Sequence, residues 1–366
     1  MNANYFGLIF LLVAAAGAAP PESSLKDAFQ GKFRIGAALN PGHYRETDAA
    51  GAALVKQHFN TITPENDMKW ERIHPSADSY NFEPADKFVE FGERNHMFIV
   101  GHCLVWHSQT PKWVFEDAQG NPLTREALLV RMRDHILTIV RRYAGRVNGW
   151  DVMNEALNED GTMRQSLWMK IIGDDYVAKA FEYAHEADPK AELYYNDYSL
   201  ENEPKRRGAI ELVRKLKAKG LTVTAIGTQH HDKMDWPSVE QIDATLTEFR
   251  QLGVKVCVTE LDVDVLPRRG QTADVSATEA GANLNPYTQG LPDEKQQALA
   301  KRYADIFSVF LKHAGTIQRV TFWGVTDRTS WLNNFPVRGR TNYPLLFDRE
   351  GKTKPAFDAV IKTASR

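Results

Sequence analysis

The most restrictive feature of this sequence is a regular alternation of short apolar runs with longer amphipathic runs. From Lys32 onward, eight short runs have the pattern of buried strands, and six longer runs have the 3.6-residue period of helices. The predicted strands are 33–39, 60–63, 98–106, 147–154, 192–196, 224–229, 254–260 and 319–325. The predicted helices are 84–96, 124–143, 175–187, 203–219, 239–252 and 293–313. This alternation favours an α/β fold, a single closed parallel (β/α)8 TIM barrel, over a doubly wound sheet.

The chain has 366 residues, which suits one barrel with some long loops. We find no linker, internal repeat or low-complexity tail that would mark a second module. The widest irregular stretch, 263–291, is rich in Gly, Asn, Thr and Pro. A loop of this length within a compact domain is often functional, although it could equally be a mobile insertion.

The N-terminus has the pattern of a secretory signal peptide. An apolar run at 5–16 is followed by small residues up to Ala19 and then by Pro20 and Pro21, although no Lys or Arg precedes the run. The run is too short to cross a bilayer comfortably, and no later segment resembles a membrane span. We therefore predict a signal peptide at 1–19, a mature barrel at 20–366, and a secreted or periplasmic location.

Composition limits the classes of partner. The net charge is −2 and no long basic run occurs, so a nucleic-acid surface is not indicated.

The sequence contains two cysteines, Cys103 and Cys257, and both fall inside predicted strands. Strand alternation should turn both thiols away from a site that contains His102 and Glu260. We interpret them as small core residues and not as a disulfide or a catalytic pair.

In a barrel of this kind, the carboxyl ends of the strands build the active site. In this sequence those ends carry carboxylates, amides and tryptophans, for example in the segments 64–70, 101–109, 150–155, 259–262 and 322–331. Tryptophan rings can cover the C–H faces of a sugar, while amide and carboxylate groups bind its hydroxyls. A Gly-rich anion cradle and an Arg cluster are both missing, which disfavours a phosphorylated ligand. The mixture indicates a carbohydrate.

Glu155 and Glu260 end the fourth and seventh predicted strands. A retaining glycosidase needs two carboxyl groups about 5–5.5 Å apart, one as acid/base and one as nucleophile. Either glutamate alone could be a barrel salt bridge, but two of them flanked by amides and aromatics favour catalysis.

The ordered motifs resemble glycoside hydrolase family 10, the endo-β-1,4-xylanases. Residues 150–155 are similar to the family's acid/base signature, residues 259–262 to its nucleophile strand, and 64–70, 101–109 and 322–331 to further motifs. The resemblance extends from Phe33 to Phe357. It implies a retaining hydrolase that acts on xylan and xylo-oligosaccharides without a cofactor or metal, and we expect a monomer.

The resemblance also assigns roles. It implies that Glu155 is the acid/base and Glu260 the nucleophile, with His231 and Asp262 orienting Glu260 and Asn154 binding the sugar 2-hydroxyl. The remaining family positions are Gln229 between sugar and nucleophile, Lys69, His102, Trp106, Trp323 and Trp331 around subsite −1, Glu65, Asn66 and Gln109 at subsite −2, and Tyr198 on the leaving-group side. His107 and Trp70 are interpreted as supporting residues, and His230 as structural. Without the family pattern, the tryptophans could equally be core packing and His231 a satisfied strand-end histidine.

Three other functions remain open at this stage. Barrel cellulases and mannanases share the two glutamates, although Lys69, His102, Gln229 and Trp331 favour a xylanase. A metal-dependent hydrolase could use histidines, but a compact pattern such as H-E-x-x-H does not occur. A catalytically dead glycan-binding protein would not need both glutamates.

Overall fold

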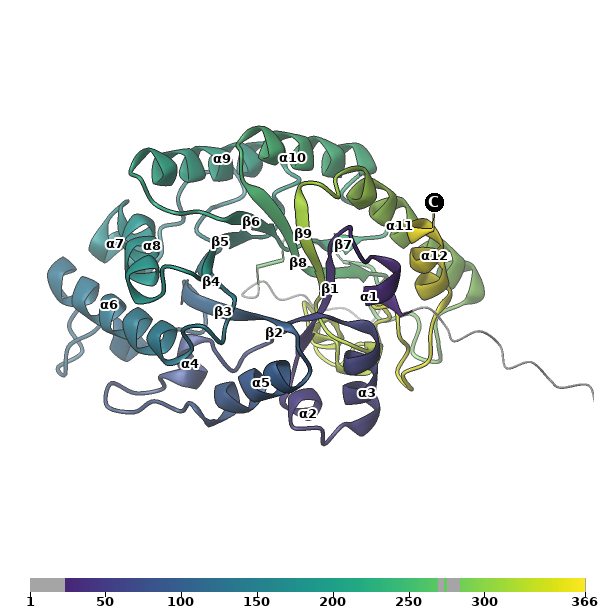
Figure 1. Ribbon diagram of the computed structural model, residues 1–366, viewed down its shortest axis with the longest axis horizontal. Coiled ribbons are helices and arrows are strands. Elements are labelled where there is room, and N and C mark those ends of the chain that lie inside the picture. The colour runs from purple at the N-terminus through teal and green to yellow at the C-terminus, as the bar shows by residue number, and fades with distance from the viewer. Residues whose placement is uncertain (1–23, 269–272, 275–283, 366) are drawn as a thin grey trace, which may run out of the picture.

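The computed structural model describes residues 24–268, 273–274 and 284–365, and within them eight parallel strands close into a barrel (Figure 1). The strands are β1 (Arg34–Leu39), β2 (Thr61–Pro64), β3 (Phe98–Trp106), β4 (Gly149–Asn154), β5 (Glu192–Asp197), β6 (Ala225–Thr228), β8 (Lys255–Asp264) and β9 (Ile317–Phe322). They pair in the order β6-β5-β4-β3-β2-β1-β9-β8, and pairing between β6 and β8 closes the ring. The predicted (β/α)8 barrel is confirmed.

Helices form the outer layer of the barrel (Figure 1). The longer ones are α3 (Ala49–His58), α5 (Glu83–Arg94), α6 (Arg125–Arg142), α8 (Tyr176–Ala187), α9 (Glu203–Ala218), α10 (Val239–Gln251), α11 (Asp293–Lys312) and α12 (Pro355–Ala364). The shorter ones are α1 (Leu25–Ala28), α2 (Pro41–Tyr44), α4 (Trp70–Ile73), α7 (Leu167–Ile172), and the 3-10 turns η1 (Lys112–Val114), η3 (Asp327–Thr329) and η4 (Trp331–Asn333). The six predicted helices are confirmed to within two residues at each end. In the described ranges, no helix is both long and apolar enough to cross a membrane.

Local signals explain where several helices begin and end. The Thr124 side chain accepts the amide of Ala127 at the start of α6, and Ser238 and Gln241 form a reciprocal capping box at the start of α10. Gly253 ends α10 with a φ of +74°, a conformation that costs glycine little. Polar caps and glycines visible in the sequence therefore fix these boundaries.

The sixth strand is interrupted next to the site, which the sequence did not predict. The predicted strand 224–229 stops at Thr228, His230 adopts a φ of +59°, and a short strand β7 (His231–Lys233) resumes beside β8. In this register His231 lies opposite Asp262.

The seventh strand is longer than the predicted range 254–260, because β8 extends to Asp264. The irregular stretch predicted to begin at 263 therefore begins after the strand; its residues 269–272 and 275–283 lie outside the described ranges, as does the predicted signal peptide.

Cys257 packs in a small cluster of buried residues with Val100, Tyr194 and Ala225. Both cysteines are free and buried, so their interpretation as core residues without a disulfide is confirmed. Cys103 is not among the residues that line the cavity at the carboxyl end of the barrel, although the charges of Lys69, Glu155 and Glu260 act on its buried thiol. Strand β3 shifts register between His102 and Val105, and simple alternation fails there.

The tight packing of β3 against β4 yields a stability test. A Cβ on Gly101 would overlap the indole of Trp150, which is 1% exposed. We expect Gly101→Ala to lower the free energy of unfolding by about 1–3 kcal/mol, because the rigid ring has to move. Gly315 has open space around its Cα, so Gly315→Ala serves as the control and should leave stability nearly unchanged. Chemical denaturation of both variants measures this, and equal stabilities would contradict the packing argument.

Candidate active site

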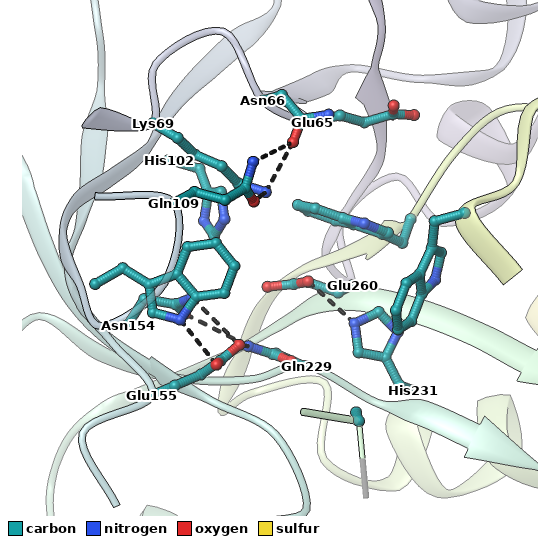
Figure 2. Close-up of a pocket in the computed structure, with 14 residues that line it drawn as sticks. Glu65, Asn66, Lys69, His102, Gln109, Asn154, Glu155, Gln229, His231 and Glu260 are labelled. Atoms are coloured by element: carbon teal, nitrogen blue, oxygen red, sulfur yellow. Dashed lines mark hydrogen bonds and ion pairs between the residues drawn. The ribbon is translucent and has the colours of Figure 1, made fainter. Parts of the chain in front are cut away.

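A cavity of about 150 Å³ opens at the carboxyl end of the barrel (Figure 2). It is lined by Glu65, Asn66, Lys69, His102, Trp106, Gln109, Asn154, Glu155, Gln229, His231, Glu260, Ala273, Trp323 and Trp331. Most of these residues lie at the ends of β2, β3, β4, β6, β8 and β9 or directly after them. The barrel therefore gathers side chains from across the sequence into one concave site.

Glu155 follows β4 directly and has a left-handed backbone, with a φ of +57°. This conformation costs a residue with a side chain about 1–2 kcal/mol. Both of its backbone polar groups are bound: its N–H donates to the carbonyl of Asn196 at 2.8 Å, and its carbonyl accepts Nε of Arg164 at 3.2 Å. These bonds hold the turn that directs the Glu155 side chain into the cavity (Figure 2).

The Glu155 carboxyl is buried and accepts three hydrogen bonds. Oε2 accepts the indole N–H of Trp106 at 2.8 Å, while Oε1 accepts the amides of Gln229 at 3.0 Å and Asn154 at 3.3 Å. Burial raises the pKa of Glu155 to about 7, helped by the negative charge of Asp197 and opposed by the bonds from Gln229 and Trp106. Glu155 is thus mostly protonated below neutral pH.

The environment of Glu260 acts in the opposite direction. Its Oε1 accepts the amide of Asn196 at 2.8 Å, and its Oε2 lies 3.1 Å from Nε2 of His231. Burial would raise the pKa of Glu260, but His231, the charge of His102 and the Asn196 hydrogen bond outweigh it, so that the pKa is lowered. Glu260 is therefore a buried carboxylate that stays ionised.

His231 supplies the compensating positive charge. Its Nδ1 lies 3.1 Å from Oδ1 of Asp262, whose Oδ2 accepts the indole N–H of Trp331 at 2.7 Å. Burial lowers the pKa of His231, yet Asp262 and Glu260 together raise it to about 10. His231 is therefore a cation that donates one N–H to each carboxylate.

An amide network joins the two glutamates. Nδ2 of Asn196 donates to Glu260 and also, at 2.9 Å, to Oδ1 of Asn154, which is itself bonded to Glu155. Figure 2 shows both carboxyl groups pointing into the same cavity from different strands. One protonated and one ionised carboxyl at a single cavity is the arrangement needed to break a glycosidic bond.

Comparison with known proteins agrees with this chemistry. The sequence profile described as glycosyl hydrolase family 10 matches residues 24–363. The chain belongs to this family. The family 10 protein is 43% identical to the endo-1,4-beta-xylanase A of Xylanibacter ruminicola, over 98% of each chain. It is 41% identical to the beta-1,4-xylanase of Dictyoglomus thermophilum, over 98% of this chain and 95% of that one. The solved structure of an endoxylanase of the same family, retrieved from sugarcane soil metagenome, superimposes with a TM-score of 0.90 at 47% identity, covering 93% of this chain and 99% of that one.

The structure brings thirteen of the fifteen predicted site residues into the cavity lining of the family 10 protein. On the wall formed by β2 and β3, Lys69 donates to Asn66 and to Gln109, both at 3.0 Å. Its ammonium also lies 4.9 Å from the ring centre of Trp106. Glu65 completes this wall, where burial raises its pKa and Lys69 partly opposes the rise. This wall offers charged and amide groups for sugar hydroxyls.

Two tryptophans form the opposite wall. Trp323 presents its ring to His102 and His231 in edge contacts, with ring centres 5.4 and 6.3 Å apart. Trp331 tilts onto His231 at 4.8 Å and stacks on Phe335 at 4.6 Å. Both rings line the cavity and are held in place by aromatic neighbours. The alternative that the sequence left open, in which these tryptophans only pack in the core, therefore does not apply.

Asp262 and Tyr198, the other two predicted residues, do not line the cavity. Asp262 is fully buried behind His231, in the supporting position predicted for it. Tyr198 is only 2% exposed, its hydroxyl accepts Arg164 at 2.8 Å, and Nζ of Lys205 lies 3.3 Å from its ring centre. In this structure its side chain is engaged by two cations rather than presented to a substrate.

The residues predicted to be supporting or structural also have clear positions. Nδ1 of His107 lies 4.0 Å from Oε2 of Glu155, and burial lowers the pKa of His107 to about 4, so this histidine is neutral. Trp70 is buried and stacks on His135 at 3.5 Å. His230 is buried between Glu201 and Asp232.

The histidines and carboxylates of the described ranges form no group of three or more His, Cys, Asp and Glu that could hold a metal ion.

Three contributors to the site were not predicted from the sequence. Asn196 bridges to Glu260 and fixes the Glu155 backbone; it lies in a strand-end motif, so position could have indicated it. Arg164 lies in the loop after β4, where the sequence gives no periodic signal. Ala273 lines the cavity from the long loop after β8, and nothing in its residue type indicates that role.

The indole hydrogen bond to Glu155 makes a testable prediction. Trp106→Phe removes a donor that favours the ionised carboxylate, so we expect the pKa of Glu155 to rise above its wild-type value of about 7. Carbon NMR of ¹³C-labelled glutamate side chains measures the titration directly. Trp168→Phe is the matched control, because the Trp168 indole donates to a backbone carbonyl, that of Trp106, and should leave the titration in place. A fall in the pKa of Glu155 in Trp106→Phe would contradict the assignment.

Proposed function

We propose that this protein is a retaining endo-1,4-β-xylanase that hydrolyses internal β-1,4-xylosidic bonds of xylan, with Glu155 as acid/base and Glu260 as nucleophile. The observation that carries the proposal is that two buried carboxyl groups line one cavity with different partners, neutral donors at Glu155 and a histidine at Glu260. Relatives at 43% and 41% identity that bear xylanase names support the substrate.

In the first step, a carboxylate oxygen of Glu260 forms a bond to the anomeric carbon while the glycosidic C–O bond breaks. Glu155 gives its proton to the departing oxygen, which leaves as the hydroxyl of the shortened chain. Asn154 is placed to bind the sugar 2-hydroxyl, where hydrogen bonds strengthen as positive charge develops on the ring. Gln229, which is bonded to Glu155, would position the sugar from the β6 side.

In the second step, water replaces Glu260 at the anomeric carbon. Formation of the ester removes the negative charge of Glu260, which lowers the proton affinity of Glu155 and lets it act as a base. Glu155 takes a proton from the water while the ester bond breaks, so the anomeric configuration is retained overall. The cation His231 stabilises the carboxylate that Glu260 becomes again.

Selection of xylose over glucose is part of the proposal. Xylose lacks the C6 hydroxymethyl group, so Trp323 and Trp331 can close against C5 of the sugar at subsite −1. A glucan would have to place its extra group against these rings, which is exclusion by steric clash. Lys69 and His102 would bind hydroxyls at this subsite, and Glu65, Asn66 and Gln109 those of the next sugar.

We also propose that the protein is exported and acts as a monomer. The apolar run and the small residues of segment 1–19 support export, because they have the pattern of a signal peptide. A polymeric substrate fits this location.

Replacing the two glutamates should produce different losses. Glu260→Ala should abolish turnover on every substrate, because no ester can form. Glu155→Ala should lose activity on xylan by a factor on the order of 10²–10⁴. On aryl xylobiosides whose leaving group needs no proton it should keep kcat/KM, while its turnover is limited by hydrolysis of the ester, which still lacks its base. Added azide should restore turnover of Glu155→Ala and give a β-xylobiosyl azide, identified by NMR. An α-azide would contradict double displacement.

The pH dependence follows from the two environments. Glu155 has to be protonated, so kcat/KM on xylo-oligosaccharides should fall as pH rises through about 7. Glu260 has to be ionised, and its lowered pKa should keep the acidic limb below that of an ordinary glutamate. Initial rates between pH 3 and 9 test this, and a kcat/KM that still increases above pH 8 would contradict the acid assignment.

A further inference from the structure

A buried ion pair lies outside the cavity, behind the turn that carries Glu155. Asp197, the last residue of β5, and Lys205, in the first turns of α9, both have fully buried side chains, and Nζ lies 3.0 Å from Oδ1. Neither residue lines the cavity. Moving two charges out of water costs several kcal/mol each, so such a pair adds little net stability to a fold.

The Asp197 carboxylate is fully satisfied and bonded to the Glu155 turn. Its Oδ2 accepts the backbone N–H of Leu157 at 3.3 Å and the hydroxyl of Tyr195 at 2.5 Å. Its Oδ1 accepts the N–H of Tyr198 at 2.9 Å and also forms the ion pair with Lys205. Leu157 is two residues after Glu155, so a negative charge is held directly against the chain segment that presents the acid.

The positive charge of Lys205 is shared among several partners. Its Nζ lies 3.3 Å from the ring centre of Tyr198 and 3.8 Å from a carboxylate oxygen of Glu159, besides Asp197. Lys205 therefore fixes the position of the Asp197 carboxylate while only partly cancelling the effect of its charge on Glu155.

Other charged and titratable groups also face Glu155. They are Lys69 from the loop after β2, Cys103 from β3, the neutral His107 directly after β3, Arg164 from the loop after β4, Tyr198 after β5, and Glu260 from β8. Among the negative charges, Asp197 raises the pKa of Glu155 more than Glu260 does. The two negative charges also differ in how long they last during the reaction. The charge of Glu260 disappears when the ester forms, whereas that of Asp197 remains.

We propose that Asp197 and Lys205 are positioning residues for the reaction: Asp197 fixes the 155–157 turn and holds a negative charge behind Glu155, and Lys205 fixes the Asp197 carboxylate and weakens the effect of its charge on Glu155. This inference rests on the proposed function. Asp197 provides a permanent charge, so Glu155 keeps enough affinity for a proton to accept one from water after the charge of Glu260 has gone. The proton is held by Glu155 at the start of the cycle and returns to it in the second step.

The test is the pH profile of Asp197→Asn on xylo-oligosaccharides. Asparagine keeps the size and an acceptor oxygen but removes the charge, and it leaves Lys205 as an uncompensated cation. Both effects favour ionised Glu155, so the basic limb of kcat/KM should move to lower pH while the acidic limb stays. The ratio of kcat/KM at pH 7.5 to that at pH 5 should fall by about threefold or more, the effect of half a pH unit. A basic limb that stays in place or moves upward would overturn the proposal.

Two controls separate this charge effect from loosened packing. Tyr195→Phe removes one hydrogen bond to Asp197 without changing its charge, so the basic limb should stay at its wild-type position. An aryl xylobioside with a 2,4-dinitrophenolate leaving group needs no proton from Glu155 in the first step. The limb shift of Asp197→Asn should therefore be absent from kcat/KM on that substrate, whereas a distorted site would impair both substrates.

Lys205→Gln gives the opposite sign and an independent test. With its counter-charge removed, Asp197 acts more strongly on Glu155, and the basic limb should move to higher pH. If circular dichroism shows that Asp197→Asn does not fold, Lys205→Gln decides, and an unmoved or lowered limb would overturn the proposal. Failure of both variants to fold would also overturn it, because the pair would then serve the fold. A wild-type protein that does not cut xylan would instead contradict the proposed function itself.

Discussion

Two buried carboxyl groups at one cavity have to be kept in opposite protonation states, and the rest of the site is arranged around that constraint. Burial alone would raise the pKa of both glutamates. The difference comes from their partners: Glu260 faces a histidine that Asp262 holds as a cation, whereas Glu155 faces neutral donors and the negative charge of Asp197. The pair therefore remains asymmetric although both groups are withdrawn from water.

The barrel supplies this asymmetry through irregularities at the carboxyl ends of its strands. The interruption between β6 and β7 sets His231 opposite Asp262, and the left-handed turn after β4 directs Glu155 inward. Amide side chains then connect the strands, with Asn196 reaching both Glu260 and the backbone of Glu155. The regular strands form the barrel, and the irregular backbone at their ends orients the reacting side chains.

Much of this could be predicted from the sequence, because strand-end positions in a parallel barrel converge whatever their separation along the chain. Eight apolar runs were sufficient for the fold, and thirteen predicted residues line one cavity. Local irregularity was not predictable: β3 shifts its register between His102 and Val105, and the ends of the sixth and seventh strands were misplaced. Tyr198 shows a second limit, since a strand-end aromatic can be engaged by buried cations such as Lys205 and Arg164. Those partners come from elements whose sequence carries no signal of the contact.

The central claim is the distribution of protons among Glu155, Glu260 and His231, and neutron diffraction from a deuterium-exchanged crystal near pD 6 observes it directly. The account predicts a deuteron on the Glu155 carboxyl, deuterons on both ring nitrogens of His231, and none on Glu260. A deuteron on Glu260 together with a bare Glu155 carboxylate would contradict it, as would a singly protonated His231 between two carboxylates.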